Sequence, residues 1–255
     1  MRALKLCFLA DDTPPASKAL AFLTGRYGNT AFSKADVAVV LGGDGFMLQM
    51  LHKCIRYGKA LYGMNCGTVG FLLNRFSVDD LPARVMNAEP IALHPLKMTA
   101  QCASGKIREG LAFNEVSLLR QSRQAAELQI SVDGMTKLAR LVCDGALVST
   151  PAGSTAYNFS VHGPILPLTS NVLALTPVSA FRPRRWHGAL LPETAEVTFD
   201  ILDGAKRPVS AVADFTEIRN VRKVSVRQAR DVSMMLLFDA DYSLEDRVLN
   251  EQFLT

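Results

Sequence analysis

The stretch "VAVVLGGDGFML", residues 37–48, passes from an apolar run through three glycines and one carboxylate into a second apolar segment. The apolar run Val37–Leu41 lies within a strand predicted at Ala35–Leu41, and the apolar spacing of Phe46–Arg56 predicts a helix. Glycine costs roughly 0.5–1 kcal/mol relative to alanine inside a regular element, so stability does not explain three of them. A strand that opens into bare backbone at the start of a helix is typical of the ligand-binding edge of a parallel sheet.

The segments around this stretch repeat its strand–helix order. Strands are predicted at Leu4–Ala10 and Ala60–Met64, with a helix at Pro15–Tyr27. Such alternation predicts βαβ units and a parallel sheet. We therefore expect an N-terminal α/β, Rossmann-like domain over residues 1–90.

The pattern changes near residue 92, where alternation with a period of two residues begins. It is clearest in two triplets, Leu128, Ile130 and Val132, and Val197, Phe199 and Ile201. Asp133–Gly134 and Asp203–Gly204 are predicted to form hairpin turns. We expect a β-rich domain over residues 91–230. The segment 231–255 fits either domain, and a return to the first domain is one alternative.

Composition restricts the class of protein. The 255 residues are 49% hydrophobic with a formal net charge of +4, which suits an anionic ligand but not a nucleic-acid partner. No apolar run is long enough for a membrane span, so we expect a cytoplasmic protein with no membrane partner. The 5 cysteines form no C-x-x-C pair and the 4 histidines suggest no metal cluster, so no protein metal site is predicted. The densest basic cluster, Arg182, Arg184 and Arg185, is interpreted as a solvated loop, with contact to substrate phosphates as the alternative.

Familiar nucleotide and hydrolase motifs do not fit the chain. The pairs Gly58–Lys59 and Gly105–Lys106 lack the remaining residues of a P-loop. The stretch "NCGTVGFL", beginning at Asn65, lacks the first glycine of a G-x-G-x-x-G dinucleotide fingerprint. Ser154 has alanine two residues away on each side, where a nucleophile elbow requires glycine.

Two further stretches concentrate polar groups beside apolar strands. Residues 142–160, "VCDGALVSTPAGSTAYNFS", hold a dense set of hydroxyl side chains around Gly153. This density suits hydrogen bonding to a sugar or a base, and a plain surface loop is the alternative. Asn114 and Glu115 interrupt an apolar strand, where unpartnered polar groups are costly. They either pair with neighbouring groups or hold a ligand.

In combination, these stretches resemble the bacterial NAD kinase family across residues 35–215. The matching motifs stand in the family's order: Gly42-Gly43-Asp44-Gly45, Asn65-x-Gly67-x-x-Gly70-Phe71-Leu72, Asn114-Glu115, Asp144-Gly145, Ser149-Thr150-Pro151-x-Gly153-Ser154-Thr155-Ala156-Tyr157 and Gly163-Pro164. The Ser149–Tyr157 block is the most specific of them, since the first motif is shared with related lipid kinases.

The resemblance implies a kinase that transfers the γ-phosphoryl group of ATP, or a phosphoryl group of polyphosphate, to the 2′-hydroxyl of the adenosine ribose of NAD. The product is NADP. It also implies an α/β domain followed by a β-sandwich-like domain, with the active site between them. Mg²⁺ is the expected cofactor, and a homodimer or homotetramer is expected to complete the site across subunits.

Site residues follow from the resemblance by position. Asp44 is expected to be the catalytic base at the 2′-hydroxyl, and Gly42, Gly43 and Gly45 are expected to line the phosphates. Further NAD-binding positions are Phe71, Asn114, Glu115, Asp144, Ala152, Thr155, Ala156, Tyr157, Asn158, Phe159, Ser160 and Ser179. Within this set Phe71 is assigned to the adenine region and Asn114 and Glu115 to the ribose. Asp144 is assigned to a ligand held mainly by a neighbouring subunit.

The chain departs from the family pattern at four positions. Phe46 follows the glycine motif where the family often has a smaller or polar residue, and Ala152 replaces a common hydroxyl residue. His162 stands where glycine is usual and is interpreted as structural. Asp214 is followed by phenylalanine instead of glycine, which leaves its match to a late family carboxylate open.

Two rival functions share some of these features. A diacylglycerol- or sphingosine-type lipid kinase uses the same glycine motif but needs an apolar substrate tunnel, whereas residues 149–160 offer hydroxyls. A non-catalytic NAD(P) sensor would bind the same ligand without needing Asp44. Formation of NADP from ATP and NAD distinguishes the three functions.

Overall fold

The computed structural model describes residues 4–68 and 70–240. These residues form two compact units: the first ends at Leu93 and resumes at Val232, and the second runs from His94 to Asp231. The division falls three residues later than the sequence boundary at residue 90, because strand β4 (Glu89–Leu93) pairs within the first unit. The segment from 231 returns to the first unit through β17 (Met234–Phe238), and its residues after 240 lie outside the described part.

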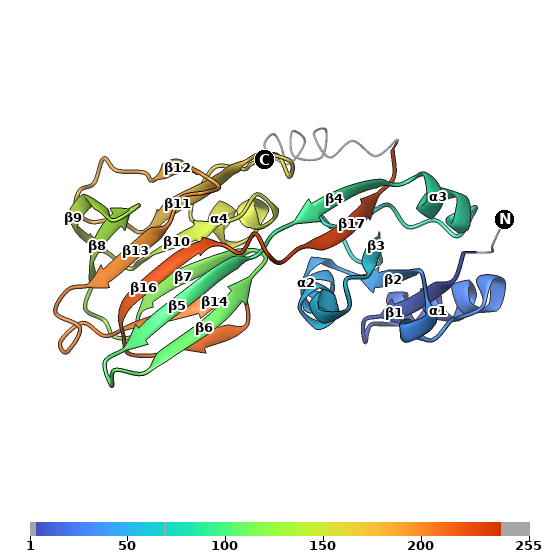
Figure 1. Ribbon diagram of the computed structural model, residues 1–255, viewed down its shortest axis with the longest axis horizontal. Helices are drawn as coiled ribbons and strands as arrows, with labels where there is room; N and C mark the ends of the chain where they lie inside the picture. The colour runs from blue at the N-terminus through green and yellow to red at the C-terminus, as the bar shows by residue number, and fades with distance from the viewer. Residues whose placement is uncertain (1–3, 69, 241–255) are drawn as a thin grey trace. The chain divides into compact units, whose positions relative to one another are not determined.

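The first unit is built on a five-stranded sheet in the order β1-β2-β3-β17-β4 (Figure 1). β1, β2 and β3 are parallel, and β17 lies parallel to β3 and antiparallel to β4. The predicted βαβ order is confirmed. The elements of this unit, besides β4 and β17, are β1 (Leu6–Ala10), α1 (Pro14–Tyr27), η1 (Phe32–Lys34), β2 (Val37–Gly42), α2 (Asp44–Cys54), η2 (Ile55–Tyr57), β3 (Ala60–Asn65) and α3 (Leu81–Asn87).

Local sequence explains where the elements next to the glycine motif begin and end. Thr13 caps α1, since its hydroxyl accepts the Ala16 N–H at 3.4 Å, and prolines fill the first helical positions. Gly28 ends that helix with a φ of 72°. All 6 residues of β2 are buried, as expected for an inner strand of a parallel sheet. This buried strand carries the glycine motif to the carboxyl edge of the sheet.

The second unit consists of two six-stranded antiparallel sheets, in the orders β6-β5-β16-β13-β8-β9 and β12-β11-β10-β7-β14-β15 (Figure 1). Side chains from both sheets, among them Leu96, Leu118 and Phe199, form one buried core. The predicted β-sandwich-like domain is confirmed. Its strands are β5 (Leu96–Cys102), β6 (Ile107–Ala112), β7 (Glu115–Arg120), β8 (Ala126–Val132), β9 (Met135–Cys143), β10 (Gly145–Ser149), β11 (Val172–Val178), β12 (Ala189–Pro192), β13 (Val197–Ile201), β14 (Val209–Ala213), β15 (Thr216–Ile218) and β16 (Val221–Gln228).

One of the two predicted hairpin turns is confirmed and the other is wrong. Asp133 and Gly134 have φ values of 50° and 76° and join the paired strands β8 and β9. Asp203 also has a positive φ, of 53°, but the strands on its two sides, β13 and β14, belong to different sheets. The turn signal was therefore real, and the assumption that the flanking strands pair was the error.

Gly145 sets a testable limit on the packing of the second unit. A Cβ added there would lie 1.9 Å from the Leu118 carbonyl oxygen, whereas a Cβ at Gly204 would meet only the Ile201 side chain at 3.5 Å. We expect Gly145→Ala to lower the free energy of unfolding by about 2 kcal/mol or more, because β7 and β10 must separate. Gly204→Ala should change it by less than about 0.5 kcal/mol. Urea unfolding measures both, and equal stabilities of the two variants would contradict the packing.

Candidate active site

Asp44 stands at the first position of α2, directly after β2 and the cap residue Gly43. Its carboxylate accepts two backbone hydrogen bonds, from the Phe71 N–H at 2.7 Å and from the Leu72 N–H at 2.9 Å. The two bonds hold one oxygen each, so the carboxylate is fixed in position beside the glycine motif.

The three glycines of the motif differ in what surrounds them. A Cβ at Gly42 would lie 3.0 Å from the Phe46 Cβ and 3.1 Å from the Asp11 Cβ, so packing explains this glycine. A Cβ at Gly43 or Gly45 would have no described heavy atom within 4 Å, and neither has a positive φ. Neither packing nor backbone strain therefore explains Gly43 and Gly45. Their bare backbone at a helix start leaves room for a phosphate to approach the amide groups.

In the second unit, Asn114 and Glu115 lie where the chain passes from the sheet of β6 to the sheet of β7. Asp214 holds this junction, since its carboxylate accepts the Phe113 N–H at 2.7 Å and the Asn114 N–H at 3.2 Å. The Thr150 N–H donates to the Asn114 carbonyl at 2.9 Å from the other side. The junction backbone is therefore clasped by two separate segments.

Gly153 shows how closely the hydroxyl-rich block approaches that junction. A Cβ at Gly153 would lie 2.2 Å from the Asn114 carbonyl oxygen, so only glycine fits there. The block continues as the short helices η3 (Ala152–Thr155) and α4 (Tyr157–Ser160). The close approach places the start of η3 directly against Asn114.

Two polar atoms of this junction are buried and have no hydrogen-bond partner among the described residues: Oδ1 of Asn114 and Oε2 of Glu115. Burial, with the nearby negative charge of Asp214 as a second cause, raises the pKa of Glu115 to about 7. Unpaired buried acceptors are rare in folded proteins because each loses its hydration without compensation. The pair is well placed to accept hydrogen bonds from a ligand hydroxyl.

The hydroxyl-rich block contains side chains that form hydrogen bonds within the unit and side chains whose hydroxyls form none with described residues. Ser149, Thr150, Ser154 and Asn158 are buried and bond within the unit; for example, Asn158 Oδ1 accepts the Thr176 hydroxyl at 2.7 Å and its Nδ2 donates to the Pro164 carbonyl at 2.8 Å. The side chains of these four residues therefore help to build the loop. The hydroxyls of three residues make no hydrogen bond to any described residue: Thr155, Tyr157 and Ser160.

Two other predicted positions, Asp144 and Ser179, adjoin one end of β10. Ser149 pairs with Glu115 at one end of this strand, and Gly145 pairs with Val178 at the other. Asp144 and Ser179 adjoin that second end, roughly 17 Å from Ser149 at the usual rise per strand residue.

The pKa of Tyr157 is affected by charged groups at both ends of β10. Burial, then the charges of Glu115 and Asp144, raise the pKa of Tyr157. The pKa of the phenol thus responds to a carboxylate at each end of the strand. Among the other predicted positions Ala152 is buried, Ala156 is half-buried, and Phe159 and Ser160 are exposed.

Residues 113–199 match the family model of the ATP-NAD kinase C-terminal domain. The chain is 55% identical to the NAD kinase of Caulobacter vibrioides, an alignment that covers 98% of this chain and 96% of that protein. It is 52% identical to the NAD kinase of Xanthomonas campestris pv. campestris, over 98% of this chain and 97% of that protein. The chain belongs to the NAD kinase family.

Membership of the NAD kinase family makes the chain an enzyme that phosphorylates NAD and sets aside the lipid-kinase and sensor alternatives. Two solved structures share its fold. Yeast NADH kinase complexed with NADH has a TM-score of 0.80 at 20% identity, covering 98% of this chain and 88% of that one. An Archaeoglobus fulgidus NAD kinase in complex with ATP has a TM-score of 0.73 at 20% identity, covering 97% of this chain and 96% of that one.

Several supporting residues of this NAD kinase were not identified from the sequence. Asp214 was noticed but left without a role, and its function in holding the junction shows only in the structure. Leu72 was part of a family motif, yet nothing in the sequence indicated that its amide binds Asp44. His162 is exposed and follows α4 with a φ of 63°, a backbone conformation that favours the glycine usual at this position.

The described residues contain neither a protein metal cluster nor a membrane-length helix. No group of three or more His, Cys, Asp or Glu side chains within residues 4–68 and 70–240 is arranged so that it could hold a metal ion. None of the described helices is long and apolar enough to cross a membrane. The basic cluster is exposed, with Arg182 and Arg184 near the ring of Phe181, at 5.4 and 5.1 Å from its centroid.

The raised pKa of Glu115 predicts a pH-dependent cost of folding. The folded, ligand-free protein favours the neutral carboxyl, so this cost is absent below pH 4.5 and grows until the pH passes about 7. We expect Glu115→Gln to match the wild type near pH 4.5 and to be more stable at pH 8, by up to about 3 kcal/mol. Denaturant unfolding at both pH values measures the difference. A stability difference independent of pH would contradict the assignment.

Proposed function

We propose that this enzyme transfers the γ-phosphoryl group of ATP to the 2′-hydroxyl of the adenosine ribose of NAD, in the cytosol, with Asp44 as the general base. The observation that carries the proposal is the Asp44 carboxylate, held by the amides of Phe71 and Leu72 beside two glycines with open space above them. An oriented base next to bare amide groups provides both needs of phosphoryl transfer, a positioned nucleophile and stabilised phosphate charge.

ATP is the proposed donor, and polyphosphate is the alternative. The solved Archaeoglobus fulgidus NAD kinase is in complex with ATP, which supports a nucleotide donor for its relative here. Backbone amides recognise phosphate oxygens and not the rest of the donor, so the same loop would accept a polyphosphate chain. Assay of both donors with the purified protein distinguishes them.

The carboxylates near the glycine motif fit a Mg²⁺ ion that arrives with the donor. Mg²⁺ in nucleotide sites is usually held by one or two carboxylates together with the phosphates, so no larger protein cluster is needed. Asp11, directly after β1, lies against Gly42, and Asp44 follows the neighbouring strand β2. Asp11 is the residue we assign to the ion, which would neutralise charge on the transferred group.

The second unit is proposed to bind the NAD substrate. Asn114 Oδ1 and Glu115 Oε2 are assigned to the adenosine ribose, because both are buried acceptors without a described partner. Thr155, Tyr157 and Ser160 are assigned to the rest of the dinucleotide through hydroxyls that no described residue uses. The yeast relative in complex with NADH supports a dinucleotide ligand for this fold.

Homo-oligomerisation is the proposed means of completing the site. Asp144 lies at the far end of β10 from Glu115, half-exposed and paired with Arg120. A carboxylate at that position is available to a ligand bound by a second copy of the chain, in a homodimer or homotetramer. Sedimentation equilibrium and an NADP-formation assay on an Asp144 variant would together show whether assembly and activity change in parallel.

Asp44→Asn tests the base directly. The amide cannot take the proton of the 2′-hydroxyl, and general-base assistance is typically worth 10²–10⁴-fold, so kcat should fall by about 10²-fold or more. NAD binding, measured by calorimetry, should change by less than about threefold because the proposed ribose and dinucleotide contacts lie in the second unit. Near-normal turnover of this variant in an ATP-dependent NADP assay would refute the assignment.

Gly45→Ala should move stability and activity in opposite directions. Alanine in this helical position has no described steric conflict and should raise the free energy of unfolding by about 0.5–1 kcal/mol. The added methyl group should obstruct the phosphates and lower kcat/KM for ATP by about tenfold or more. Gly25→Ala is the matched control, since Gly25 is helical with equally open space and should gain stability alone. Unchanged activity of Gly45→Ala would remove Gly45 from the phosphate site.

A further inference from the structure

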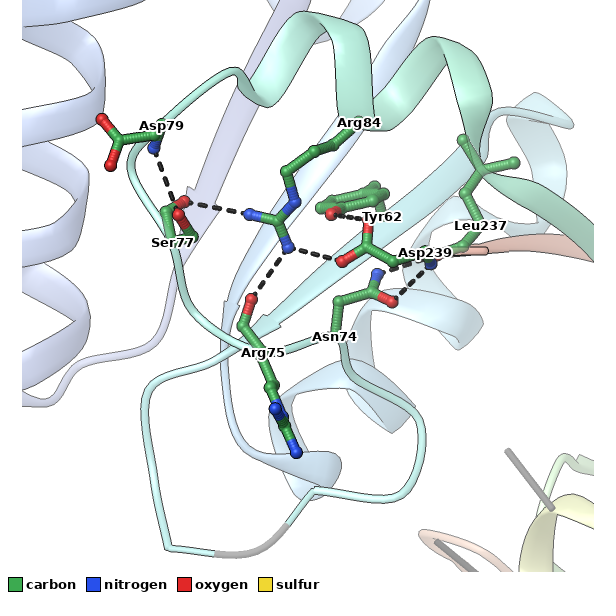
Figure 2. A network of polar contacts seen from close by, with 8 residues as sticks. All are labelled: Tyr62, Asn74, Arg75, Ser77, Asp79, Arg84, Leu237 and Asp239. Carbon is green, nitrogen blue, oxygen red and sulfur yellow. Dashed lines mark hydrogen bonds and ion pairs between the residues drawn. The ribbon is translucent and has the colours of Figure 1, made fainter. Parts of the chain in front are cut away.

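A partly buried polar network surrounds Asp239, the residue that follows β17 in the first unit (Figure 2). Its Oδ2 pairs with the Arg84 guanidinium and its Oδ1 accepts the Tyr62 hydroxyl. The side chains of Arg84 and Asp239 are only 20% and 16% exposed. Burial first, and then the bond to Asp239, raise the pKa of Tyr62, so its hydroxyl stays a donor. The network is thus an ordered, charged arrangement in a place with little water.

Asn74 connects this network to the segment before it. Its Nδ2 donates to the Leu237 carbonyl at 2.9 Å and its Oδ1 accepts the Asp239 N–H at 2.9 Å, so the side-chain amide is satisfied by β17 and the residue after it (Figure 2). Its backbone is equally fixed: the Asn74 N–H donates to the Gly63 carbonyl at 2.8 Å, and its carbonyl accepts the Asn65 N–H at 2.9 Å. Asn74 is fully buried.

Only one residue separates Asn74 from the amides that hold the catalytic carboxylate. Leu72 donates to Asp44, Leu73 is fully buried, and Asn74 follows at once. The segment therefore has one end bonded to Asp44 and the other end bonded to β17. A shift of Asn74 would be passed to the Leu72 amide through two peptide units, which have few free torsions.

We propose that Asn74, supported by Asp239, is a positioning residue for the catalytic carboxylate: it fixes the segment 71–74 so that its amides orient Asp44. The proposal rests on the proposed role of Asp44 as the base. Stability alone is a weak explanation for the network, since a buried ion pair is often no more stabilising than packed apolar side chains. Orientation of a catalytic group is a purpose that apolar side chains could not serve here, because they offer no partner for the Asp239 N–H or the Leu237 carbonyl.

The experiment is a double-mutant cycle with the full chain. Asn74→Ala removes both side-chain bonds to β17 and its following residue, and Asp44→Asn removes the base. If Asn74 acts through Asp44, Asn74→Ala should lower kcat about ten- to hundredfold in the wild-type background and by less than about twofold in the Asp44→Asn background. KM for NAD should change by less than about threefold in either background.

A merely structural role gives a different result. A loss of folded or competent protein would lower kcat by the same factor in both backgrounds, and equal losses would overturn the proposal. An unchanged kcat for Asn74→Ala in the wild-type background would overturn it as well. Failure of the base assignment is recognised beforehand, because Asp44→Asn alone would then retain its turnover.

Two further variants keep the test decisive. Asn74→Leu nearly preserves the volume of the buried side chain but removes both of its bonds to β17 and the residue after it, and it replaces Asn74→Ala in the same cycle if that protein does not fold. Asp79→Asn is the control, since it breaks the Arg26–Asp79 pair in the same unit, at 2.9 Å but with side chains 44% and 72% exposed. Asp79→Asn should leave kcat within about twofold of the wild type.

Discussion

The hydrogen bonds from the Phe71 and Leu72 amides to the Asp44 carboxylate connect the loop between β3 and α3 to the start of α2. A charged acceptor gains more from such bonds than a neutral one, and two amides fix both its oxygens. The second unit contains a similar arrangement, since the Asp214 carboxylate accepts hydrogen bonds from the Phe113 and Asn114 amides where the chain passes from one sheet to the other. Each unit therefore has an aspartate that accepts neighbouring backbone amides, Asp44 beside the glycine motif and Asp214 beside Asn114 and Glu115.

In the second unit, polar groups with hydrogen-bond partners lie beside polar groups without a described partner. Thr150, Ser154 and Asn158 are fully used in holding the η3–α4 segment. Next to them, Asn114 Oδ1 and Glu115 Oε2 are left without a described partner. The fully hydrogen-bonded side chains are held rigidly, so the unpaired acceptors beside them cannot move to find a hydrogen-bond partner within the chain. A preorganised binding site requires this rigidity.

The sequence predicted the elements that depend on local pattern. Apolar runs and glycine turns located β1, β2, β3 and the β8–β9 hairpin, and the motif order of the Ser149–Tyr157 block identified the family. Long-range pairings could not be predicted in this way. Asp239 and Tyr62 are separated by 177 positions, and β17 carries no signal for its place beside β3. Composition located the hydroxyl-rich block but does not show which hydroxyls point inward, because that depends on the packing around Gly153.

The place of β17 in the first sheet has a consequence for the newly made chain. In the order β1-β2-β3-β17-β4, the edge strand β4 is joined to the others only through β17. A ribosome makes β17 on the order of 10 seconds or more after β4, at the usual pace of about 5–20 residues per second. The whole antiparallel second unit emerges in that interval. The nascent first unit must therefore wait with an open strand edge, and the segment 71–74, whose amides bind Asp44, gains its anchor through Asn74 only after β17 has been made.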